Sequence, residues 1–330
     1  MSDDPSASMP SLVDFGDGEE GSQSASRSVN ETESSYFHGK VMVITGAGGQ
    51  FGRSGCLYFA RRGAKVAALD NSKDGLKDTF TALEKELGTG TFEFKPYICD
   101  VTDPKQIERV IDSIEMRYKR IDLLWNNAGY QGKIKPMLEY DPEDFKTVMD
   151  VNVTGMFIVM QAVALRMKNH QSAGGCAICN TASVAGLRGT PAMIAYASSK
   201  AAVLSMTVCA SKDLAPYNIR VNAVSPALIG PGFMWDRQNQ LHAKSGSPYF
   251  ATDPDVVAQN KIAGVPMKRL GSVEEVLNVV AFLLSDQSSY MTGANLQVDG
   301  GMAAGLKIQS SLSHSAVKHF IHHQLPLGIY

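Results

Sequence analysis

The sequence lacks the cysteine pattern of a secreted, disulfide-held protein. Its 330 residues include only five cysteines, and such usage suits a reducing compartment. Cys176 and Cys179 form one C-x-x-C pair in a short apolar run that predicts a buried strand, where residues three apart point to opposite faces. No second cysteine pair or histidine cluster completes a metal site around them. We therefore expect a cytoplasmic protein without a bound metal.

Charge of one sign and long apolar runs are also missing. The formal net charge is −2, so the chain has no basic field that would attract nucleic acid. No apolar run reaches the ~18 residues that cross a bilayer. With 44% hydrophobic residues over this length, the chain can bury a sizeable core. We expect a globular protein that binds neither nucleic acid nor membrane.

The two ends of the chain differ in composition from the rest. Residues 1–38 hold ten serines and eight acidic residues against one base, Arg27, with too few large apolar groups to offset the entropy of ordering. We expect a disordered tail there, and its acidity is unlike a secretory or mitochondrial leader. A second tail over 304–330 carries His314, His319, His322 and His323. A histidine-rich tail can bind metal, but we expect a solvated or interface segment.

Short apolar runs alternate with longer helical patterns between these ends. The predicted strands are 41–45, 65–69, 92–98, 121–125, 176–180, 219–224 and 295–298. The predicted helices end at about 62 and 87, begin at Pro104, and cover about 144–169, 194–214 and 273–284. This alternation is typical of an α/β fold whose parallel sheet is covered on both faces. We expect one domain over 39–303, with an insert at 228–268 long enough to be a lid.

A glycine-rich loop follows the first predicted strand. The stretch T-G-A-G-G-Q-F-G runs from Thr45 to Gly52 and leads into a helix. Glycines at such a turn let main-chain N–H groups approach a pyrophosphate at the helix N-terminus, which favours negative charge. Many turns are glycine-rich, so the position between a strand and a helix is what favours a dinucleotide site.

Asp70 closes the second predicted strand, eighteen residues after Gly52. A carboxylate there can accept hydrogen bonds from the adenosine ribose and would repel a 2′-phosphate. The next residues, Asn71 and Ser72, supply no base. Charge therefore favours NAD over NADP. The alternative is that Asp70 only caps the following helix.

Tyr196 and Lys200 lie four residues apart in a predicted helix, thirteen and seventeen residues after Ser183. One helical turn places the phenol and the ammonium on the same face. A tyrosine ordinarily loses its proton at about pH 10, and an adjacent cation lowers that value, so the pair can act as acid and base near neutral pH. Ser183 would hydrogen-bond the substrate oxygen. The alternative is an amphipathic helix that carries both residues by chance.

Five motifs in this order resemble those of the short-chain dehydrogenase/reductase family. They are the loop 45–52, N-N-A-G at 126–129, Asn152, Ser183 and Tyr196-x-x-x-Lys200. The resemblance spans about 39–303 and implies a Rossmann-type doubly wound sheet with a nicotinamide cofactor. It implies that Tyr196 is the general base in oxidation and that Lys200 lowers its pKa and binds the nicotinamide ribose. Ser183 would hold the reacting oxygen, and Asn152 would support a water chain.

The same resemblance implies a set of cofactor-binding residues. They are Gly46, Gln50, Phe51, Gly52, Asp70, Asp100, Val101, Asn127, Ala128, Gly129, Tyr196, Lys200, Pro226 and Ile229. Asp100 and Val101 would contact the adenine, and the segment 226–229 would reach the carboxamide. Family members usually associate through the helices predicted at 144–169 and 194–214, so a homotetramer is implied.

Two positions depart from the family pattern. Gln50 stands where the family has a second glycine, and a glutamine tolerates positive φ poorly. We expect a slightly different bend or an amide contact to the phosphate. Pro226 is followed by Ala227 rather than glycine, which would stiffen the lid hinge.

A narrower resemblance concerns the substrate. Four stretches are similar to NAD-dependent xylitol dehydrogenases of this family: N-N-A-G-Y-Q-G from Asn126, L-A-P-Y-N-I-R-V-N-A from Leu214, G-P-G-F-M-W-D-R-Q from Gly230, and S-P-Y-F-A-T-D-P further on. This similarity implies that a sugar alcohol is oxidised at a secondary carbon. The expected substrate-facing residues are Ser183, Tyr196, Gln131, Met234 and Trp235. The alternative for Met234 and Trp235 is packing within the lid.

Two other functions share parts of this pattern. An NADPH-dependent carbonyl or 3-oxoacyl reductase would carry the same motifs, but Asp70 speaks against it. A non-catalytic dinucleotide sensor or scaffold would not need Ser183, Tyr196, Lys200 and Asn152 together. The sequence therefore predicts an NAD(H)-dependent oxidoreductase of a small alcohol/ketone pair, with a sugar alcohol such as xylitol as the expected substrate.

Overall fold

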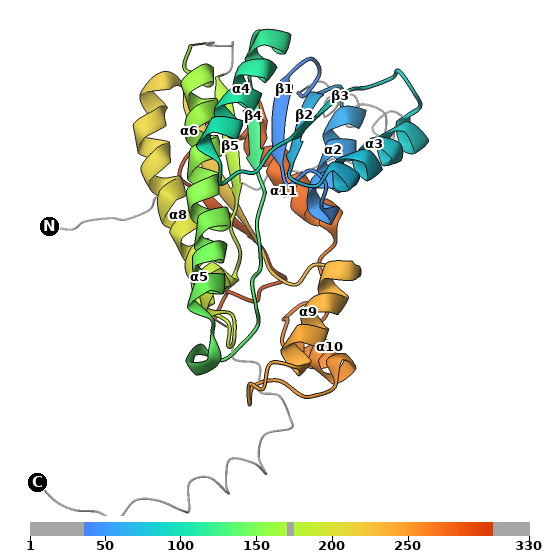
Figure 1. Cartoon of the computed structure of the whole chain (residues 1–330), viewed down its shortest axis with the longest axis vertical. Helices are drawn as coiled ribbons and strands as arrows, with labels where there is room; N and C mark the ends of the chain where they lie inside the picture. The colour runs from blue at the N-terminus through green and yellow to red at the C-terminus, as the bar shows by residue number, and fades with distance from the viewer. Residues whose placement is uncertain (1–35, 170–174, 306–330) are drawn as a thin grey trace, which may run out of the picture.

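A parallel sheet of seven strands forms the centre of the protein (Figure 1). The computed structural model describes residues 36–169 and 175–305, so the predictions for the two tails lie almost wholly outside the described residues. The strand order is β3-β2-β1-β4-β5-β6-β7, which reverses between β1 and β4. Such a reversal opens a crevice at the carboxyl ends of the strands. The predicted Rossmann-type α/β fold is confirmed.

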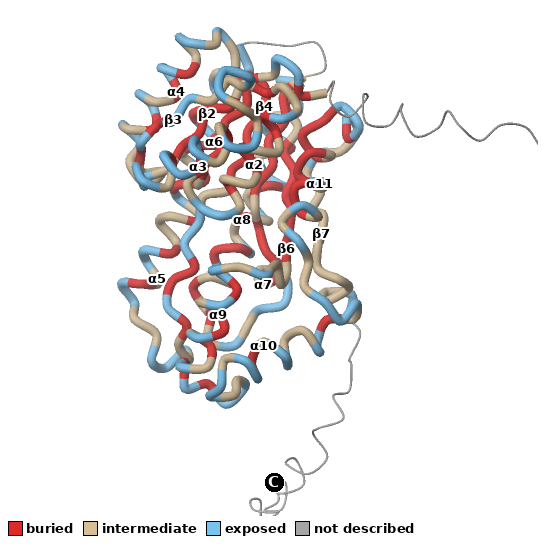
Figure 2. The backbone as a smooth tube through the Cα atoms, turned by 90° about the vertical axis from the view of Figure 1, so that its right-hand side faces the viewer, coloured by how far each residue is buried: buried red, intermediate tan, exposed pale blue. Residues whose placement is uncertain are grey.

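The strands are mostly buried on both faces. They are β1 (Val41–Thr45), β2 (Lys65–Asp70), β3 (Glu93–Ile98), β4 (Leu123–Asn126), β5 (Cys176–Thr181), β6 (Ile219–Pro226) and β7 (Asn295–Val298). In register, Val43 of β1 lies opposite Ala67 of β2 and Leu124 of β4. Figure 2 shows buried segments gathered along these strands. Burial on both faces explains why most inner strands read as apolar runs, while the edge strands β3 and β7 are partly exposed.

Helices cover the sheet in two layers, each with its own apolar core. One layer holds α2 (Gln50–Arg61), α3 (Lys73–Leu87) and α11 (Val273–Leu284), and the other holds α4 (Pro104–Tyr118), α6 (Met156–Met167) and α8 (Ile194–Leu214). Phe59 and Trp125 pack in the first core, and Ile111 in the second. Cys179 belongs to the first and Cys176 to the second. The opposite orientation predicted for the two thiols is confirmed.

Capping side chains fix where the helices begin. The Asp103 carboxylate accepts from the main-chain N–H groups of Lys105 and Gln106 at the start of α4. Ser272 and the third residue of α11, Glu275, form a capping box. At α3 the cap is Ser72, whose hydroxyl accepts from Gly75 N at 3.0 Å. The alternative that Asp70 caps this helix is therefore wrong.

The helix predicted at 144–169 begins and ends two residues earlier and is interrupted. It consists of α5 (Pro142–Met149), a π-helical turn (Asp150–Gly155) and α6. Among the described residues, the helical stretch Pro142–Met167 is long and apolar enough to cross a membrane. Its most apolar window has a mean hydropathy of 1.7. The unbroken apolar runs of the sequence did not predict such a stretch. Half of its most apolar window is buried, and Val159 and Val163 lie in the core. These features are typical of a core helix in a globular protein.

The insert predicted as a lid projects away from the sheet, and its two ends lie close together (Figures 1 and 2). It contains α9 (Phe233–Ala243) and α10 (Pro254–Ala263). Gly230 N donates to Gly271 O, and Gly271 N donates to Leu228 O, both at 3.0 Å. These two bonds join the ends of the insert. Short segments complete the fold: η1 (Met137–Glu139), α7 (Ala185–Arg188), η3 (Ala215–Tyr217) and η4 (Asp286–Ser288).

Candidate active site

One cleft beside the lid collects nearly all the predicted site residues. Its volume is about 910 Å³, within the range of cofactor and substrate sites, ~300–1,000 Å³. The predicted residues that line it are Gly46, Gln50, Phe51, Gly52, Asp70, Asp100, Val101, Asn127, Ala128, Gly129, Gln131, Ser183, Tyr196, Lys200, Pro226, Ile229, Met234 and Trp235. Asn152 is the one predicted residue that does not line it.

Two glycines give the loop after β1 its shape. Gly46 has a φ of 68°, and a Cβ there would lie 3.0 Å from Cα of Ala128. A Cβ on Gly52 would lie 2.1 Å from the carbonyl oxygen of Gly46, a distance that no side chain allows. The main chain therefore folds back tightly at the N-terminus of α2. This cradle fits the diphosphate of a dinucleotide, because main-chain N–H groups at a helix N-terminus favour an anion.

Gln50 does not strain the loop. It is the first residue of α2, and the positive φ of this turn falls on Gly46. The expected difficulty with φ at Gln50 is therefore wrong. Its side chain instead reaches the lid, since a Cβ built on Gly232 would lie 2.6 Å from Nε2 of Gln50. The predicted amide contact to a phosphate stays a prediction.

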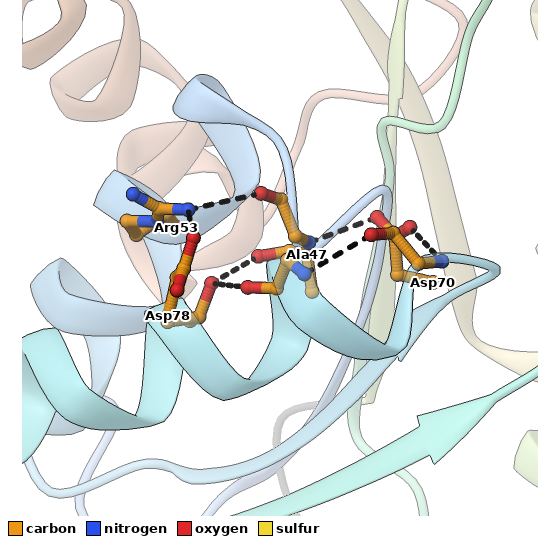
Figure 3. Close-up of polar contacts among 8 residues, drawn as sticks. Ala47, Arg53, Asp70 and Asp78 are labelled. Atoms are coloured by element: carbon orange, nitrogen blue, oxygen red, sulfur yellow. Dashed lines mark hydrogen bonds and ion pairs between the residues drawn. The ribbon is translucent and has the colours of Figure 1, made fainter.

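Asp70 is bonded to the glycine loop as well as facing the cleft (Figure 3). Its Oδ2 accepts from Gly48 N at 2.8 Å, and its Oδ1 accepts from Ser72 N at 2.8 Å. The loop is held on its other side by α3, where Oγ1 of Thr79 donates to Ala47 O at 2.8 Å. Arg53 donates to Gly48 O at 3.4 Å. The carboxylate that faces the cleft thus also fixes the loop.

Thr45 joins the glycine loop to the N-N-A-G segment after β4. Its Oγ1 accepts from the main-chain N–H groups of Asn127 and Ala128, both at 2.9 Å. The side chain of Asn127 returns a bond to Thr45 O at 3.2 Å. The two segments that flank the reversal of strand order therefore form one wall of the cleft.

Ser183, Tyr196 and Lys200 meet where β5 ends and α8 begins. Nζ of Lys200 donates to Thr181 O at 2.8 Å and lies 5.6 Å from the centre of the Tyr196 ring. Ser183 shares a hydrogen bond with Tyr196. A Cβ on Gly186 would lie 2.6 Å from the carbonyl carbon of Lys200, so this glycine lets α7 approach α8. The chance alternative for the pair fails, because both side chains face the same cleft as Ser183.

Burial governs the acidity of this group. Burial raises the pKa of Tyr196 above its ordinary value, and the hydrogen bond from Ser183 opposes that rise. Burial also lowers the pKa of Lys200 to about 8. The expected lowering of the Tyr196 pKa by Lys200 is not found, because burial of the phenol has the largest effect on that pKa.

Asn152 stands behind the cleft wall and connects two elements. It is fully buried in the π-helical turn. Its Nδ2 donates to Tyr130 O and to Oγ of Ser199, both at 2.9 Å, while its Oδ1 accepts from Tyr130 N at 2.7 Å. A π turn redirects a side chain out of the regular helical face. The structure therefore shows Asn152 as a brace between the loop after β4 and α8, and its support of a water chain stays a prediction.

The predicted substrate-facing residues differ in their surroundings. Gln131 is only 9% exposed, and neither amide atom has a hydrogen-bond partner among the described residues. Trp235 is 8% exposed and Met234 is 44% exposed, so Trp235 both packs in the lid and faces the cleft. Residues missed in the sequence include Cys99, Thr102, Tyr130, Thr147, Asp150, Val151, Thr181, Leu228 and Gln238. Thr147 lies on α5, where the sequence carries no motif, whereas Tyr130 and Gln238 lie within stretches that were quoted from the sequence without assigning these two residues to the cleft.

Sequence comparison places the chain among oxidoreductases. A family profile described as enoyl-(acyl carrier protein) reductase matches residues 50–303. A 3-oxoacyl-(acyl-carrier-protein) reductase of Thermotoga maritima is 37% identical over 266 residues, covering 81% of this chain and 98% of that protein. A levodione reductase of Leifsonia aquatica is 32% identical over 268 residues, covering 81% and 96%.

Solved structures agree with these relatives. An NAD⁺-bound xylitol dehydrogenase is similar with a TM-score of 0.77 and 47% identity, covering 80% of this chain and 99% of that chain. A 3-ketoacyl-(acyl-carrier-protein) reductase from Brucella melitensis, complexed with NADH, has a TM-score of 0.68 and 28% identity, covering 81% and 99%. With the glycine cradle and the Ser183, Tyr196 and Lys200 group in one cleft, these matches show that the chain is an oxidoreductase of the short-chain dehydrogenase/reductase family.

Proposed function

We propose that this protein is an NAD-dependent dehydrogenase of a secondary alcohol, with a sugar alcohol such as xylitol as substrate. One observation carries the proposal: a carboxylate suited to the ribose of NAD and a Ser–Tyr–Lys group face a single cleft. The similarity to an NAD⁺-bound xylitol dehydrogenase at 47% identity supports the polyol substrate.

The residues around the cradle fit NAD better than NADP. The Gly46–Gly52 turn would receive the diphosphate, and Asp70 would accept from the adenosine ribose. A 2′-phosphate would meet the Asp70 carboxylate, whose partners among the described residues are the N–H groups of Gly48 and Ser72 and not a cation. When bound, NAD supplies the acceptor for the hydride that leaves the alcohol carbon.

The protein's own residues would move the proton. Ser183 would hold the substrate hydroxyl beside Tyr196, and the phenolate of Tyr196 would take its proton as the carbonyl forms. Lys200 is placed to stabilise that phenolate, because its Nζ faces the same ring. In the reverse direction the phenol of Tyr196 would return the proton to the carbonyl oxygen.

Gln131 supports a polyhydroxylated substrate. An amide whose buried polar atoms lack partners costs about 1–3 kcal/mol per atom until something binds it. Gln131 lines the cleft with both amide atoms in that condition. A sugar alcohol carries hydroxyl groups that both donate and accept, so it can satisfy the two atoms at once.

The test is NADH formation across sugar alcohols, simple secondary alcohols and hydroxyacyl thioesters, repeated with NADP. We expect turnover of sugar alcohols with NAD. The competing function is the reduction of 3-oxoacyl thioesters, which the 37% identical relative performs by its name. Response to thioesters alone, or a preference for NADP, would replace the proposal with that reductase.

Tyr196→Phe tests the assigned chemistry. We expect NADH binding to be unchanged and turnover to fall by at least about 100-fold, the usual share of a general acid–base group. Tyr217→Phe, at an exposed tyrosine beyond α8, is the matched control and should keep full activity. Substantial turnover in Tyr196→Phe would remove the assigned role.

We further propose that the protein acts in the cytoplasm as a homotetramer. The support for assembly is apolar surface on the helices expected at the interface: Phe157 and Leu165 of α6 are each 46% exposed, and Val208 of α8 is 42% exposed.

A further inference from the structure

A lysine inside the lid joins α10 to α9. Nζ of Lys261 donates to Oδ1 of Asn239 at 2.8 Å and to Oε1 of Gln238 at 3.4 Å. It also lies 3.1 Å from Nδ1 of His242 and 5.3 Å from the centre of the Trp235 ring. None of these four groups is an anion. Among the residues that the structure describes, Lys261 therefore forms no ion pair, and its ammonium contacts neutral side chains.

This cluster is shielded from water. Asn239 is 3% exposed and His242 is 1% exposed. Burial, together with the charge of Lys261, lowers the pKa of His242 to about 4. Burial lowers the pKa of Lys261 to about 8. At neutral pH the histidine is therefore uncharged, and the lysine carries the charge of the cluster.

The ammonium of Lys261 contacts the oxygen end of the Gln238 amide. An ammonium only donates hydrogen bonds, so the amide atom turned to Lys261 is the oxygen. Gln238 also lines the cleft. Its Nε2 carries no hydrogen bond within the part of the chain that the structure describes. Two N–H donors are therefore left for an oxygen atom in the cleft.

A second wall of the same cleft offers a matching polar group. Gln131 approaches from the segment after β4 with its amide unpartnered among the described residues, while Gln238 approaches from the lid. Neither amide belongs to the Ser183 and Tyr196 pair that would handle the reacting oxygen. The polar groups of the cleft thus exceed what a substrate with a single oxygen would use.

We propose that Gln238 is a specificity-determining residue that donates to a substrate hydroxyl other than the reacting one, and that Lys261 is the positioning residue that turns its amide. The proposal rests on the polyol function above. Loss of the donor weakens substrate binding and leaves both proton transfer and cofactor binding intact, because Gln238 touches neither the Tyr196 group nor the glycine loop in any described contact.

The experiment compares Gln238→Leu, Lys261→Met and Lys261→Arg, with Lys244→Met as a matched control at an exposed lysine that ends α9. Steady-state kinetics with xylitol and NAD give KM and kcat, and fluorescence titration gives the Kd for NADH. For Gln238→Leu we expect KM to rise roughly tenfold, the effect of one lost hydrogen bond, with kcat and NADH binding unchanged. Lys261→Met should act in the same direction, and Lys261→Arg should recover much of the loss, since a guanidinium also only donates.

Four outcomes would overturn the inference. An unchanged KM in Gln238→Leu removes the substrate contact, and a lower kcat with unchanged KM assigns the residue to another step. Weaker NADH binding in Lys261→Met, without recovery in Lys261→Arg, shows that the lysine only holds the lid together. If the unaltered protein oxidises no polyol, the proposed function falls together with the inference.

Discussion

At the scale of single residues, Asp70 links cofactor choice to loop structure. One of its oxygens holds Gly48 in the glycine loop, and the other holds Ser72 at the start of α3. The same carboxylate faces the cleft where the adenosine ribose would lie. A change made for cofactor preference at this position therefore also loosens the loop that would bind the diphosphate.

Substitution of Asp70 should show both effects. We expect Asp70→Ala to raise KM for NAD roughly tenfold or more, because it loses the ribose contact and leaves two N–H groups unpaired. The KM of Asp70→Asn for NAD should lie between those of the unaltered protein and Asp70→Ala, since one amide oxygen can still accept from Gly48 N. Both variants lose the charge that repels a 2′-phosphate, so the ratio of KM for NADP to KM for NAD should fall. Asp213→Asn, at an exposed carboxylate near the end of α8, is the control, and an equal change in the KM ratio there would contradict the assignment.

The raised pKa of Tyr196 predicts different pH profiles for alcohol oxidation and ketone reduction. Because burial raises its pKa, the free protein holds the phenol rather than the phenolate at neutral pH. Oxidation needs the phenolate, so kcat/KM for the alcohol should climb as pH rises from 7 towards 10, about the ordinary pKa of tyrosine. Reduction needs the phenol, so its kcat/KM should stay flat near neutrality. Initial rates across this range provide the measurement, and an oxidation optimum near pH 7 would contradict the raised pKa.

The sequence could predict which side chains gather, but not how their surroundings act on them. The four-residue spacing of Tyr196 and Lys200 and the motif order placed both residues correctly beside Ser183. The opposing effect of burial on their pKa values depends on packing, which no local pattern carries. The free amide of Gln131 and the orientation of Gln238 depend in the same way on neighbours distant in sequence.

At the scale of elements, the turn between β1 and α2 sets the sharpest steric limit. Gly52→Ala would place Cβ 2.1 Å from the carbonyl oxygen of Gly46, so the loop must open. We expect NADH affinity to fall by at least roughly tenfold, because the main-chain donors move away from the diphosphate. In Gly49→Ala the nearest atom to Cβ lies at 3.5 Å, an ordinary contact, so this control should bind NADH nearly as the unaltered protein does. An equal loss of NADH affinity in the two variants would show that the close contact between Gly52 and the Gly46 carbonyl does not determine binding.

Element bounds were predictable where local chemistry marks them. α8 (Ile194–Leu214), α11 (Val273–Leu284) and β7 (Asn295–Val298) coincide with the predicted ranges. Apolar periodicity and the capping serine explain the agreement at α11. The π turn was missed because one extra residue in a turn leaves the apolar pattern of a helix almost unchanged. That turn carries Asn152, so the interruption affects the site directly.

At the scale of the whole molecule, assembly can be tested through its apolar surface. Four chains of 35.5 kDa should sediment as one species. We expect the double variant Phe157→Arg and Val208→Arg to shift the protein to smaller species, because buried unpaired charges oppose association. Ile98→Arg is the control, since Ile98 is 57% exposed on β3, the edge strand of the sheet that packs against β2. Light scattering after size exclusion measures the mass, and an unchanged mass in the double variant would place the interface elsewhere.

The main-chain hydrogen bond between Gly230 and Gly271 suggests that the lid can be replaced as a unit. Because both ends of the insert meet at one point, the chain between them can change in length or sequence without moving the register of β6 against β7. The proposed proton-transfer group, Ser183, Tyr196 and Lys200, lies just after β5 and on α8, outside that insert. Recombining lids between related sequences should therefore change the accepted alcohol while the chemistry applied to it stays the same.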